Sequence, residues 1–418
     1  FEMDAADILP KGFACPHCGK STGFTKEEDT LDGWFDSGST HFAAMKKDQG
    51  FWPATMYLEG LDQYRGWFQS SLLTAVGAFG EGAPFKECVT HGWTVDGEGR
   101  AMHKSLGNGV DPADIFNENG ADILRLWAAS ADYHADVRCS KAIFQQLSQN
   151  YLKFRNTCKF MLDNLVDFDP AHLTKAEDMP VLDRWLITKL NELIEKVEQS
   201  YNDYEFHIIT HAVNDFCVTT LSSFYLDIVK DRLYCEAADS AERRSAQTAL
   251  YLTLSTLAKL FAPILAFTCD EIWLAMPHTA EDDARNVVLN EMNKPFTAYA
   301  LDAETMARWE HIIEVRTAVN GALEEARAAK VIGKSLEADV HLTVPEGDVF
   351  LADENPAALA DLFIVSKVEL TVGGELAVKV ENAAGTKCPR CWKHSLTPNA
   401  EGLCPRCAEV VRHLPDLL

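Results

Sequence analysis

The sequence has no long uncharged apolar run, and it has too few basic residues to balance its acidic ones. A membrane-spanning helix needs about 18 or more consecutive apolar residues, whereas the longest apolar stretch, Leu250–Phe267, is interrupted by Lys259 and Pro263. We therefore expect no membrane segment and a buried helix at this stretch. The 38 Lys and Arg against 63 Asp and Glu give a net charge of −25. This charge argues against diffuse binding to nucleic acid or anionic lipid but permits a local basic patch.

Targeting signals, internal repeats and low-complexity tracts are also missing from the sequence. Without a recognisable secretory leader, we expect a cytoplasmic protein. The chain begins at Phe1 and opens on a short polar segment, so we expect a fragment whose N-terminal part is absent. Its 418 residues exceed one compact core and predict roughly two to four domains.

The twelve cysteines are not arranged as in a secreted disulfide framework. Six stand in three C-x-x-C pairs, at positions 15/18, 388/391 and 404/407, and the others are scattered singly, mostly in apolar segments. Such a pattern is more typical of a reducing cytosol with metal sites.

The two pairs in the tail predict a metal site. Two cysteines three residues apart can both reach one ion, and two such pairs supply the four thiolates of a closed structural zinc site. We therefore expect one zinc ion held by Cys388, Cys391, Cys404 and Cys407, with disulfides or unrelated thiols as the alternatives. The tail is also locally basic, which fits contact with RNA, although zinc knuckles can be basic for solubility alone.

The pair Cys15/Cys18, in the stretch "ACPHCGK", is half of such a site. No second C-x-x-C pair lies near it in the sequence. Its partners could belong to the absent N-terminal part, or the turn could bind no metal.

Apolar spacing divides the chain into three regions. Residues 57–95 read as strand, helix and strand, which predicts part of an open α/β sheet. From residue 113 to about 267 the pattern is helical and begins with one run at 113–129; its clearest apolar stripe comprises Leu182, Trp185, Leu186, Leu190, Leu193, Ile194 and Val197. A further helix is expected at about 305–330, followed by alternating strands around Val340, Val368 and Val378.

Several motifs near the N-terminus combine aromatic, acidic and glycine residues. In "LDGWFDSGS" and "YLEGLDQYRGWF" the tryptophans could simply be core residues and the glycines turn residues. However, the polar residues Glu59, Gly60, Asp62 and Gln63 cluster where a predicted strand gives way to a helix, which is where open α/β sheets bind ligands. "THGW" ends the next strand in the same way.

The loop "GRAMHKSLGNGVDP" can be explained in two ways. Gly, Asn and Asp-Pro are turn formers for backbone reasons alone. Alternatively, Lys104 and the loop amides hold a phosphate ahead of the helix that follows.

Taken in order, these motifs resemble those of bacterial isoleucyl-tRNA synthetases, which are class I aminoacyl-tRNA synthetases. The resemblance runs over almost the whole chain and rests on "WFDSGS", "YLEGLDQYRGWFQSS", "THGWTVDGEGR", "KSLGN", "GADILRLW", "FRNT", "SSFYLDIVKDRLY", "APILAFTCDEIW", "KVIGKSLEA" and "KCPRCW". The four-cysteine tail distinguishes the isoleucyl branch from the valyl and leucyl relatives.

The resemblance implies a multidomain protein. Its parts would be a Rossmann-type α/β catalytic half-domain at 1–110, a connecting helical region at 111–150, an all-α anticodon-binding bundle at 151–300, an α+β junction at 301–384 and a zinc-binding tail at 385–418. The first half of the catalytic fold and the editing insertion of the family would precede residue 1.

By the same resemblance, the ligands are ATP with magnesium, isoleucine and isoleucine tRNA. The adenylate would be contacted by Glu59, Gly60, Asp62 and Gln63, the isoleucine side chain by Trp34 and Trp67, and the nucleotide by His91 and Gly92. Lys104 matches the second lysine of the family's Lys-Met-Ser-Lys-Ser loop, which stabilises the triphosphate as pyrophosphate leaves. The family's first lysine and first serine are here Ala101 and His103, so one cation of the clamp is lost.

The implied activity is attachment of isoleucine to its tRNA through an isoleucyl-adenylate, by a monomer. Nothing in the sequence suggests covalent catalysis by a side chain, and positioning with charge stabilisation would carry the reaction. The alternative for the isolated chain is a non-catalytic, tRNA-binding zinc protein. Valyl or leucyl specificity is disfavoured by the tail.

Overall fold

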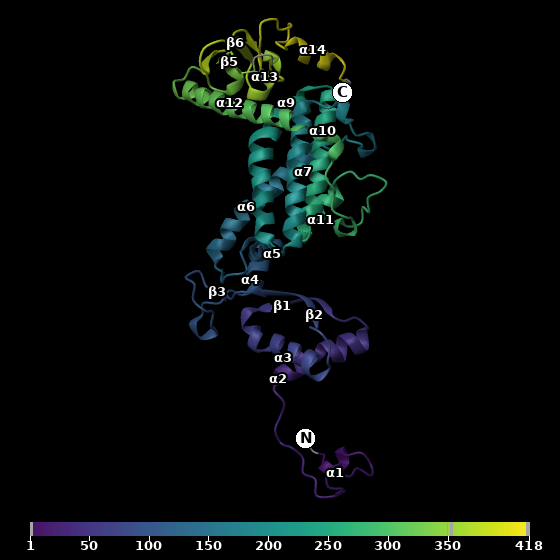
Figure 1. Ribbon diagram of the computed structural model, residues 1–418. Coiled ribbons are helices and arrows are strands. Elements are labelled where there is room, and N and C mark those ends of the chain that lie inside the picture. Colours follow the sequence, from purple (N-terminus) through teal and green to yellow (C-terminus); the bar gives the residue numbers. More distant parts are fainter. Residues whose placement is uncertain (1–2, 349, 352–353, 415–418) are drawn as a thin grey trace. The chain divides into compact units, whose positions relative to one another are not determined.

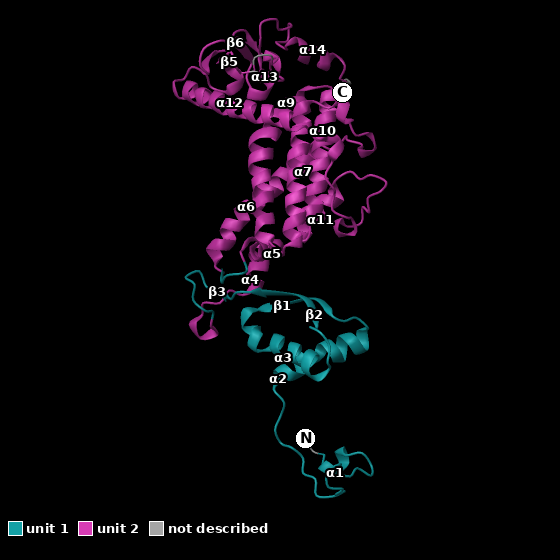
Figure 2. Ribbon diagram, in the orientation of Figure 1, with its two compact units in different colours: residues 1–102, 133–138 teal, residues 103–132, 139–418 magenta. Residues whose placement is uncertain are grey.

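The computed structural model describes residues 3–348, 350–351 and 354–414. These residues form two compact units, coloured separately in Figure 2. Unit 1 comprises Phe1–Met102 and Tyr133–Arg138, and unit 2 comprises His103–Asp132 and Cys139–Leu418. Among the described residues, no helix is both long enough and apolar enough to span a bilayer.

Unit 1 contains a parallel strand pair covered by helices. Strand β1 (Ala54–Gly60) pairs in parallel with β2 (Phe85–His91), so that Glu59 lies opposite Thr90 and Gly60 opposite His91. The crossover runs through η2 (Leu61–Arg65), α3 (Trp67–Leu73) and η3 (Thr74–Ala78). The predicted strand–helix–strand order is therefore confirmed. The remaining elements of the unit are α1 (Ala5–Ile8), α2 (Gly33–Gly38), η1 (His41–Gln49) and the parallel pair β3 (Thr94–Val95) and β4 (Val137–Arg138).

Near the start of unit 2 lie two short α-helices where the sequence predicted one. Helix α4 (Pro112–Asn119) ends at Gly120, and α5 (Ala121–Ser130) starts directly after it. Gly120 has φ +84°, a left-handed conformation that glycine adopts far more readily than other residues. The single run expected at 113–129 is thus wrong, because the apolar pattern on either side concealed the break.

Long helices then form a bundle, and several run side by side in Figure 1. They are α6 (Lys141–Asp163), α7 (Val181–Asn202), α8 (Phe206–Asp215), η7 (Phe216–Tyr225), α9 (Leu226–Cys235), α10 (Ala241–Phe261) and α11 (Ala266–Ala275). All seven residues of the predicted stripe on α7 are buried. Helix α10 is buried on most of its faces, so the buried helix expected at Leu250–Phe267 is confirmed as far as Phe261. The chain then turns at 262–265, where Pro263 interrupts the helical hydrogen bonds, and α11 follows, so the stretch does not form one helix.

A small α+β region follows the bundle. Helix α12 (Ala303–Ala328) precedes a three-stranded sheet of order β6-β5-β7, in which β5 (Ala338–Val344) pairs in parallel with β6 (Lys367–Val372) and antiparallel with β7 (Ala377–Asn382). Helix α13 (Pro356–Phe363) lies between β5 and β6 in sequence. The tail adds β8 (Thr386–Lys387), β9 (His394–Ser395) and α14 (Pro405–Arg412). Alternate residues of β5 are buried, as the sequence predicted.

Candidate functional sites

The four tail cysteines meet at one point. Their Sγ atoms all lie within 4.8 Å of one another, and those of Cys391 and Cys404 are 3.8 Å apart. Four sulfurs at about 2.3 Å from a tetrahedral zinc ion would be separated by about 3.8 Å, whereas a disulfide needs about 2.05 Å. The thiols are therefore free and spaced for a shared metal ion, as predicted from their sequence spacing.

Backbone turns hold these thiols in place. The amide of Trp392 donates to the carbonyl of Cys388 at 2.9 Å, and the amide of Cys388 donates to Lys393. On the other side, Cys404 is the N-cap of α14 with Pro405 at the first helical position, an arrangement that suits the fixed φ of proline. The site is thus built within about twenty residues.

The local environment favours a thiolate at Cys388. Burial raises the pKa of this thiol, but hydrogen bonds from the backbone amides of Cys391, Cys404 and Arg390 outweigh burial and lower the pKa to about 6. Burial raises the pKa of Cys391. Because metal ligation requires deprotonated cysteines, a divalent ion would supply the charge that lets all four thiols ionise together.

The pair Cys15/Cys18 forms a similar turn without a second half. The amide of Cys15 donates to Lys20 and that of Gly19 to Cys15, and backbone hydrogen bonds from His17 and Cys18 lower the pKa of Cys15. In the described part of the chain, the tail cluster is the one group of three or more metal-ligating side chains within this reach. This turn does not decide between the two alternatives that the sequence leaves open, half of a metal site and a turn that binds no metal.

The polar residues predicted around a ligand do lie at one edge of unit 1. Glu59 and Gly60 end β1, Asp62 and Gln63 follow in η2, and His91 ends the neighbouring β2. The strands are parallel, so these carboxyl ends share one edge. A Cβ built on Gly60 would lie 2.7 Å from Oδ1 of Asp62 and 3.7 Å from Cε1 of His91. A side chain at this position would therefore displace the carboxylate of Asp62.

Gln63 and Gly66 bring the two predicted pocket tryptophans into this neighbourhood. The Gln63 side chain accepts a hydrogen bond from the amide of Trp67 at 2.9 Å. A Cβ on Gly66 would lie 3.4 Å from the ring of Trp34. Trp67 stacks on Tyr57 with ring centroids 4.4 Å apart, whereas Trp34 is 46% exposed. Trp67 is therefore held against the core of unit 1 while remaining partly exposed, and Trp34 is the more exposed of the two rings.

Gly92 has a steric role. Its amide donates to Tyr133 at 2.8 Å, and a Cβ would lie only 2.4 Å from the carbonyl oxygen of Ala135. Gly92 thus permits close packing of the segment 133–138 against the end of β2. The ring of His91 bonds to the carbonyl of Gly92 at 2.8 Å.

The lysine loop straddles the boundary between the units. Ala101 belongs to unit 1, whereas His103 and Lys104 belong to unit 2. Lys104 begins the short helix η4 (Lys104–Leu106), which ends at Gly107 with φ +60°. The amide of His103 donates to the side chain of Asn108 at 2.9 Å. Lys104 is exposed and its side chain forms no ion pair among the residues that the structure describes.

Asp96 is a structural residue of this loop that the sequence analysis missed. Its carboxylate is 6% exposed and accepts hydrogen bonds from the amides of Glu98 and Arg100 and from the Arg100 guanidinium, all at 2.9–3.0 Å. The turn sequence "DGEG" was the available signal, since Asp commonly caps such turns.

Two profiles of known families match the chain. "tRNA synthetases class I (I, L, M and V)" matches residues 2–140, and "Anticodon-binding domain of tRNA ligase" matches residues 183–342. The chain belongs to the class I aminoacyl-tRNA synthetases. The first match contains the strand edge of unit 1, and the second contains most of the bundle.

Curated relatives extend the likeness over nearly the whole chain. The isoleucine–tRNA ligase of Moorella thermoacetica is 47% identical over 99% of this chain, and that of Syntrophotalea carbinolica is 47% identical over 98%. The chain spans 46% of the length of each.

A solved structure of a leucyl relative shares the fold. In a ternary complex from Agrobacterium radiobacter, LeuRS with tRNA and LeuAMS, the similarity has a TM-score of 0.53 at 16% identity and covers 88% of this chain and 38% of that one.

Proposed function

We propose that this chain is part of an ATP-dependent isoleucine–tRNA ligase. The longer protein would join isoleucine to the α-phosphate of ATP, releasing pyrophosphate, and would then transfer the aminoacyl group to tRNA, releasing AMP. The observation that carries the proposal is the shared strand edge at Glu59, Gly60 and His91, in a chain whose curated relatives are isoleucine–tRNA ligases. Ligands of open α/β sheets bind outside the carboxyl ends of the strands.

Each residue at the edge has a role suited to its chemistry. Glu59, Gly60, Asp62 and Gln63 would contact the aminoacyl-adenylate, and His91 and Gly92 would lie beside its nucleotide. Trp34 and Trp67 would line the isoleucine side-chain pocket with flat apolar surface. A pocket of this kind gains only about 1–3 kcal/mol per methylene against valine.

Lys104 would supply the positive charge for the phosphates of ATP, which would enter with magnesium. Its exposure and lack of an ion pair leave the ammonium available. Because the first lysine of the family's loop is here Ala101, we expect Lys104 to carry more of the charge stabilisation by itself.

Zinc is the ion that we assign to the four-cysteine site. Four thiolates without an open position are typical of structural zinc. The ion would fold and hold the tail and would take no part in adenylate chemistry.

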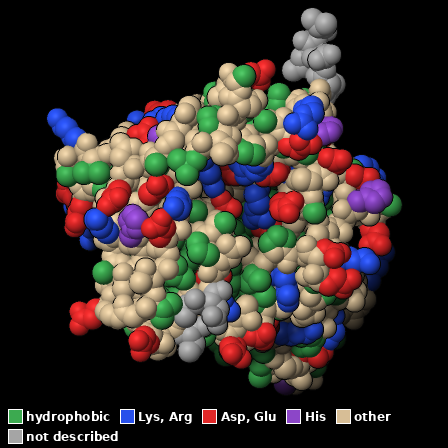
Figure 3. Space-filling view, turned by 90° about the horizontal axis from the view of Figure 1, so that it is seen from above, with side chains coloured by type: hydrophobic (Ala, Val, Ile, Leu, Met, Phe, Trp, Pro, Cys, Tyr) green, Lys and Arg blue, Asp and Glu red, His purple; other side chains and the backbone are tan. Residues whose placement is uncertain are grey.

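For tRNA, the cleft beside the metal site offers both aromatic and basic groups. It has a volume of about 470 Å³, and its lining includes Tyr234, Trp392, Lys230 and Arg390. The ring of Trp392 is 53% exposed, and the ammonium of Lys334 lies 5.4 Å from its centroid. Single-stranded RNA bases stack on such rings, and cations contact the phosphates. On the face shown in Figure 3, Lys and Arg side chains are interspersed with Asp and Glu, so RNA contact would be local.

The test of the ligase proposal is ATP–pyrophosphate exchange by the longer protein that contains this chain. Removing one charge-stabilising group at such a site typically lowers the rate by about 10²- to 10³-fold, so Lys104→Ala should fall in that range. Lys47→Ala, an exposed lysine on η1, is the matched control and should exchange normally. Ala101→Lys should raise the rate. An unchanged rate for Lys104→Ala would show that the loop is only a turn.

Unit 2 also supports the alternative of a tRNA-binding module, because it has a large core of its own and carries the Trp392 cleft on its surface. Filter binding of isoleucine tRNA to this chain should weaken steeply with salt. At a given salt concentration, Trp392→Ala should bind this tRNA more weakly than the wild type. Leu396→Ala, also in the tail and 76% exposed, should bind it as the wild type does. Equal affinity for any tRNA would contradict specific recognition.

A further inference from the structure

Three basic side chains of the metal-binding tail reach helices outside it. Arg406 forms a two-pronged pair with Asp231 on α9, at 2.5 and 2.8 Å, and contacts Glu236 at 2.9 Å. Lys393 pairs with Asp361 on α13. Planar two-pronged arginine–carboxylate pairs are geometrically specific. The tail is therefore fastened to two separate helices at defined points.

Arg390 connects the thiol cluster itself to α9. Its guanidinium lies 3.8 Å from the Sγ of Cys407 and donates to the carbonyls of Tyr234, at 3.3 Å, and Cys235. The last carbonyls of a helix have no partner within the helix, and a cation there is favoured by the helix dipole. One side chain thus satisfies the end of α9 and contacts a predicted metal ligand.

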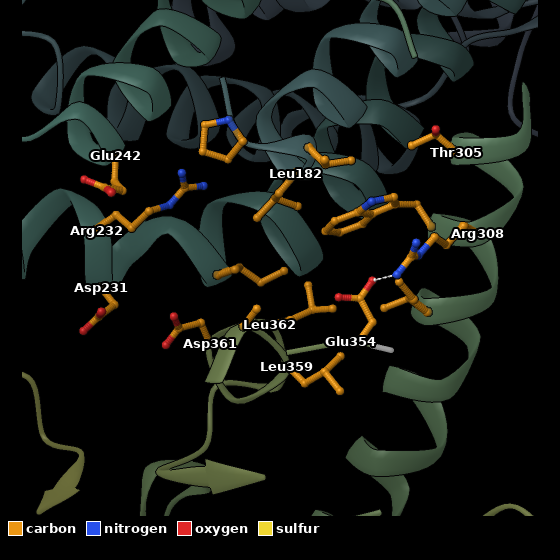
Figure 4. Close-up of a pocket in the computed structure, with 16 residues that line it drawn as sticks. Leu182, Asp231, Arg232, Glu242, Thr305, Arg308, Glu354, Leu359, Asp361 and Leu362 are labelled. Atoms are coloured by element: carbon orange, nitrogen blue, oxygen red, sulfur yellow. Dashed lines mark hydrogen bonds and ion pairs between the residues drawn. The ribbon is translucent and has the colours of Figure 1, made fainter. Parts of the chain in front are cut away.

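The two carboxylates that receive the tail also border a cavity. This cavity, of about 620 Å³, lies among α7, α9, α10, α12 and α13. In Figure 4, Asp231 and Asp361 lie on the same side, away from the Arg308–Glu354 pair. The tail therefore contacts both α9 and α13 at residues that border this cavity.

We propose that metal occupancy and the attachment of the tail to α9 are coupled through Arg390 and Arg406. Four thiolates around a divalent ion retain roughly two negative charges in excess. The Arg390 guanidinium, 3.8 Å from the Sγ of Cys407, lies where it offsets part of that charge, and the Arg406 guanidinium holds the adjoining turn of α14 to Asp231. A bound metal fixes the tail's turns and so fixes both arginines. Without metal, the turns lose their common anchor and the end of α9 loses its partners.

The consequence rests on the proposed tRNA function. Tyr234 and Arg390 line the same cleft as Trp392, so the coupling would make the geometry of the RNA-facing cleft depend on metal. By thermodynamic reciprocity, attachment to α9 must strengthen metal retention by the factor by which metal strengthens attachment.

The first experiment measures zinc release from this chain to a chelator. Asp231→Asn touches no thiol ligand, yet we expect it to release zinc about 10-fold faster. Coupled sites usually change equilibrium affinity by about 5- to 150-fold, and such affinity losses appear mostly as faster dissociation. Arg406→Gln should act likewise from the tail side. Asp227→Asn, on the same helix and paired with Lys230 at 2.8 Å, is the control and should release zinc as the wild type does.

The second experiment measures hydrogen exchange of the amides at residues 231–236 with and without zinc. Removing zinc from the wild type should increase hydrogen exchange at residues 231–236 and leave exchange in α6 and α10 unchanged. Slow exchange in α6 and α10 also serves as the control that each variant is folded. In Arg390→Met with zinc bound, exchange should already be high, and zinc removal should add little. Two results would overturn the coupling: zinc release from Asp231→Asn at the wild-type rate, or hydrogen exchange in α9 that does not change when zinc is removed. Neither readout involves RNA, so a failure of tRNA binding alone would leave it standing.

Discussion

Residues 388–407 hold their functional groups in one local module, whereas the strand edge of unit 1 presents its groups on an open surface. The four thiols converge from one turn and from the start of α14, and basic side chains beside them bind a neighbouring helix. The edge residues, by contrast, come from β1, η2 and β2, and Glu59 is exposed. The module at residues 388–407 contains all the side chains that would bind its metal ion. An open edge defines only part of a site, and its assignment depends on likeness to relatives that are about twice as long as this chain.

The cores of the two units differ in the same sense. Unit 2 buries one large cluster that extends from the bundle into the α+β region. Among the residues of unit 1 that the structure describes, the buried cluster under the strand edge comprises Ala54, Tyr57 and Phe68, while Trp34, Tyr64 and Trp93 are each at least 46% exposed. We therefore expect the cooperative packing of unit 2 to limit the structural effect of a substitution there. A substitution in unit 1 should change only the residues around it.

The largest expected effect is loss of the tail metal in Cys404→Ser. Metal-replete wild type should contain close to one equivalent of zinc, and the variant should contain almost none, because binding and folding share their free energy at such sites. Elemental analysis measures this directly. Cys18→Ser is the control and should leave the tail equivalent in place. Full retention of zinc by Cys404→Ser would contradict the assignment.

Next in size is the buried ion pair of unit 2. Asp183 is fully buried and receives two bonds from Arg232, at 2.6 and 3.0 Å, one from Tyr225 and one from Ser245. Asp183→Ala would leave the Arg232 charge uncompensated and should cost about 3–5 kcal/mol of unfolding free energy.

Urea unfolding followed by circular dichroism would measure that loss. Asp215→Ala, at an exposed position on α8, should change the unfolding free energy by less than about 0.5 kcal/mol. A loss below 1 kcal/mol for Asp183→Ala would mean that water replaces the carboxylate.

Features formed by residues close together in the sequence could be predicted from it, whereas features formed by distant residues could not. Cysteine spacing predicted the metal cluster, and apolar periodicity predicted α7 and β5, because both signals are short-range. The sequence did not predict the break at Gly120, because one glycine does not interrupt the apolar pattern on either side of it. The juxtaposition of Glu59 and His91 depends on the pairing of β1 with β2, whose paired residues lie 31 positions apart in the sequence, and local spacing does not encode that pairing. Arg390 and Arg406 lie more than 150 residues from their partners on α9, and no pattern in the sequence indicates these contacts.

A glycine substitution should test how locally unit 1 responds. A Cβ on Gly38 would lie 2.5 Å from Cβ of Ser70, so α2 and α3 would have to separate. Gly38→Ala should therefore cost about 1–3 kcal/mol, observed as faster hydrogen exchange in unit 1 alone. Gly77→Ala has no atom within 4 Å of the new Cβ and should be neutral. Increased exchange throughout unit 2 would contradict independent units.

The smallest expected effect concerns a carboxylate at the edge of the bundle. A hydrogen bond from Arg243 is the main cause that lowers the pKa of Asp167 to about 2, with Gln247 and Arg244 contributing. Since the folded pKa is depressed, the stabilisation is present above the unfolded pKa of about 3.9 and is lost as pH falls toward 2. The side chain is 41% exposed, so solvent screening should keep the contribution below about 1 kcal/mol.

Asp167→Asn should accordingly lower the unfolding free energy by less than about 1 kcal/mol at pH 7, and the difference from wild type should vanish between about pH 4 and pH 2. Urea titrations across this range would measure it. Asp163→Asn, whose partner Lys159 lies on the exposed face of α6, is the control and should show little difference at any pH. If the Asp167→Asn difference persisted unchanged at pH 2, the stabilisation would come from hydrogen bonds that the neutral side chain retains, and charge would play no part at this end of the bundle.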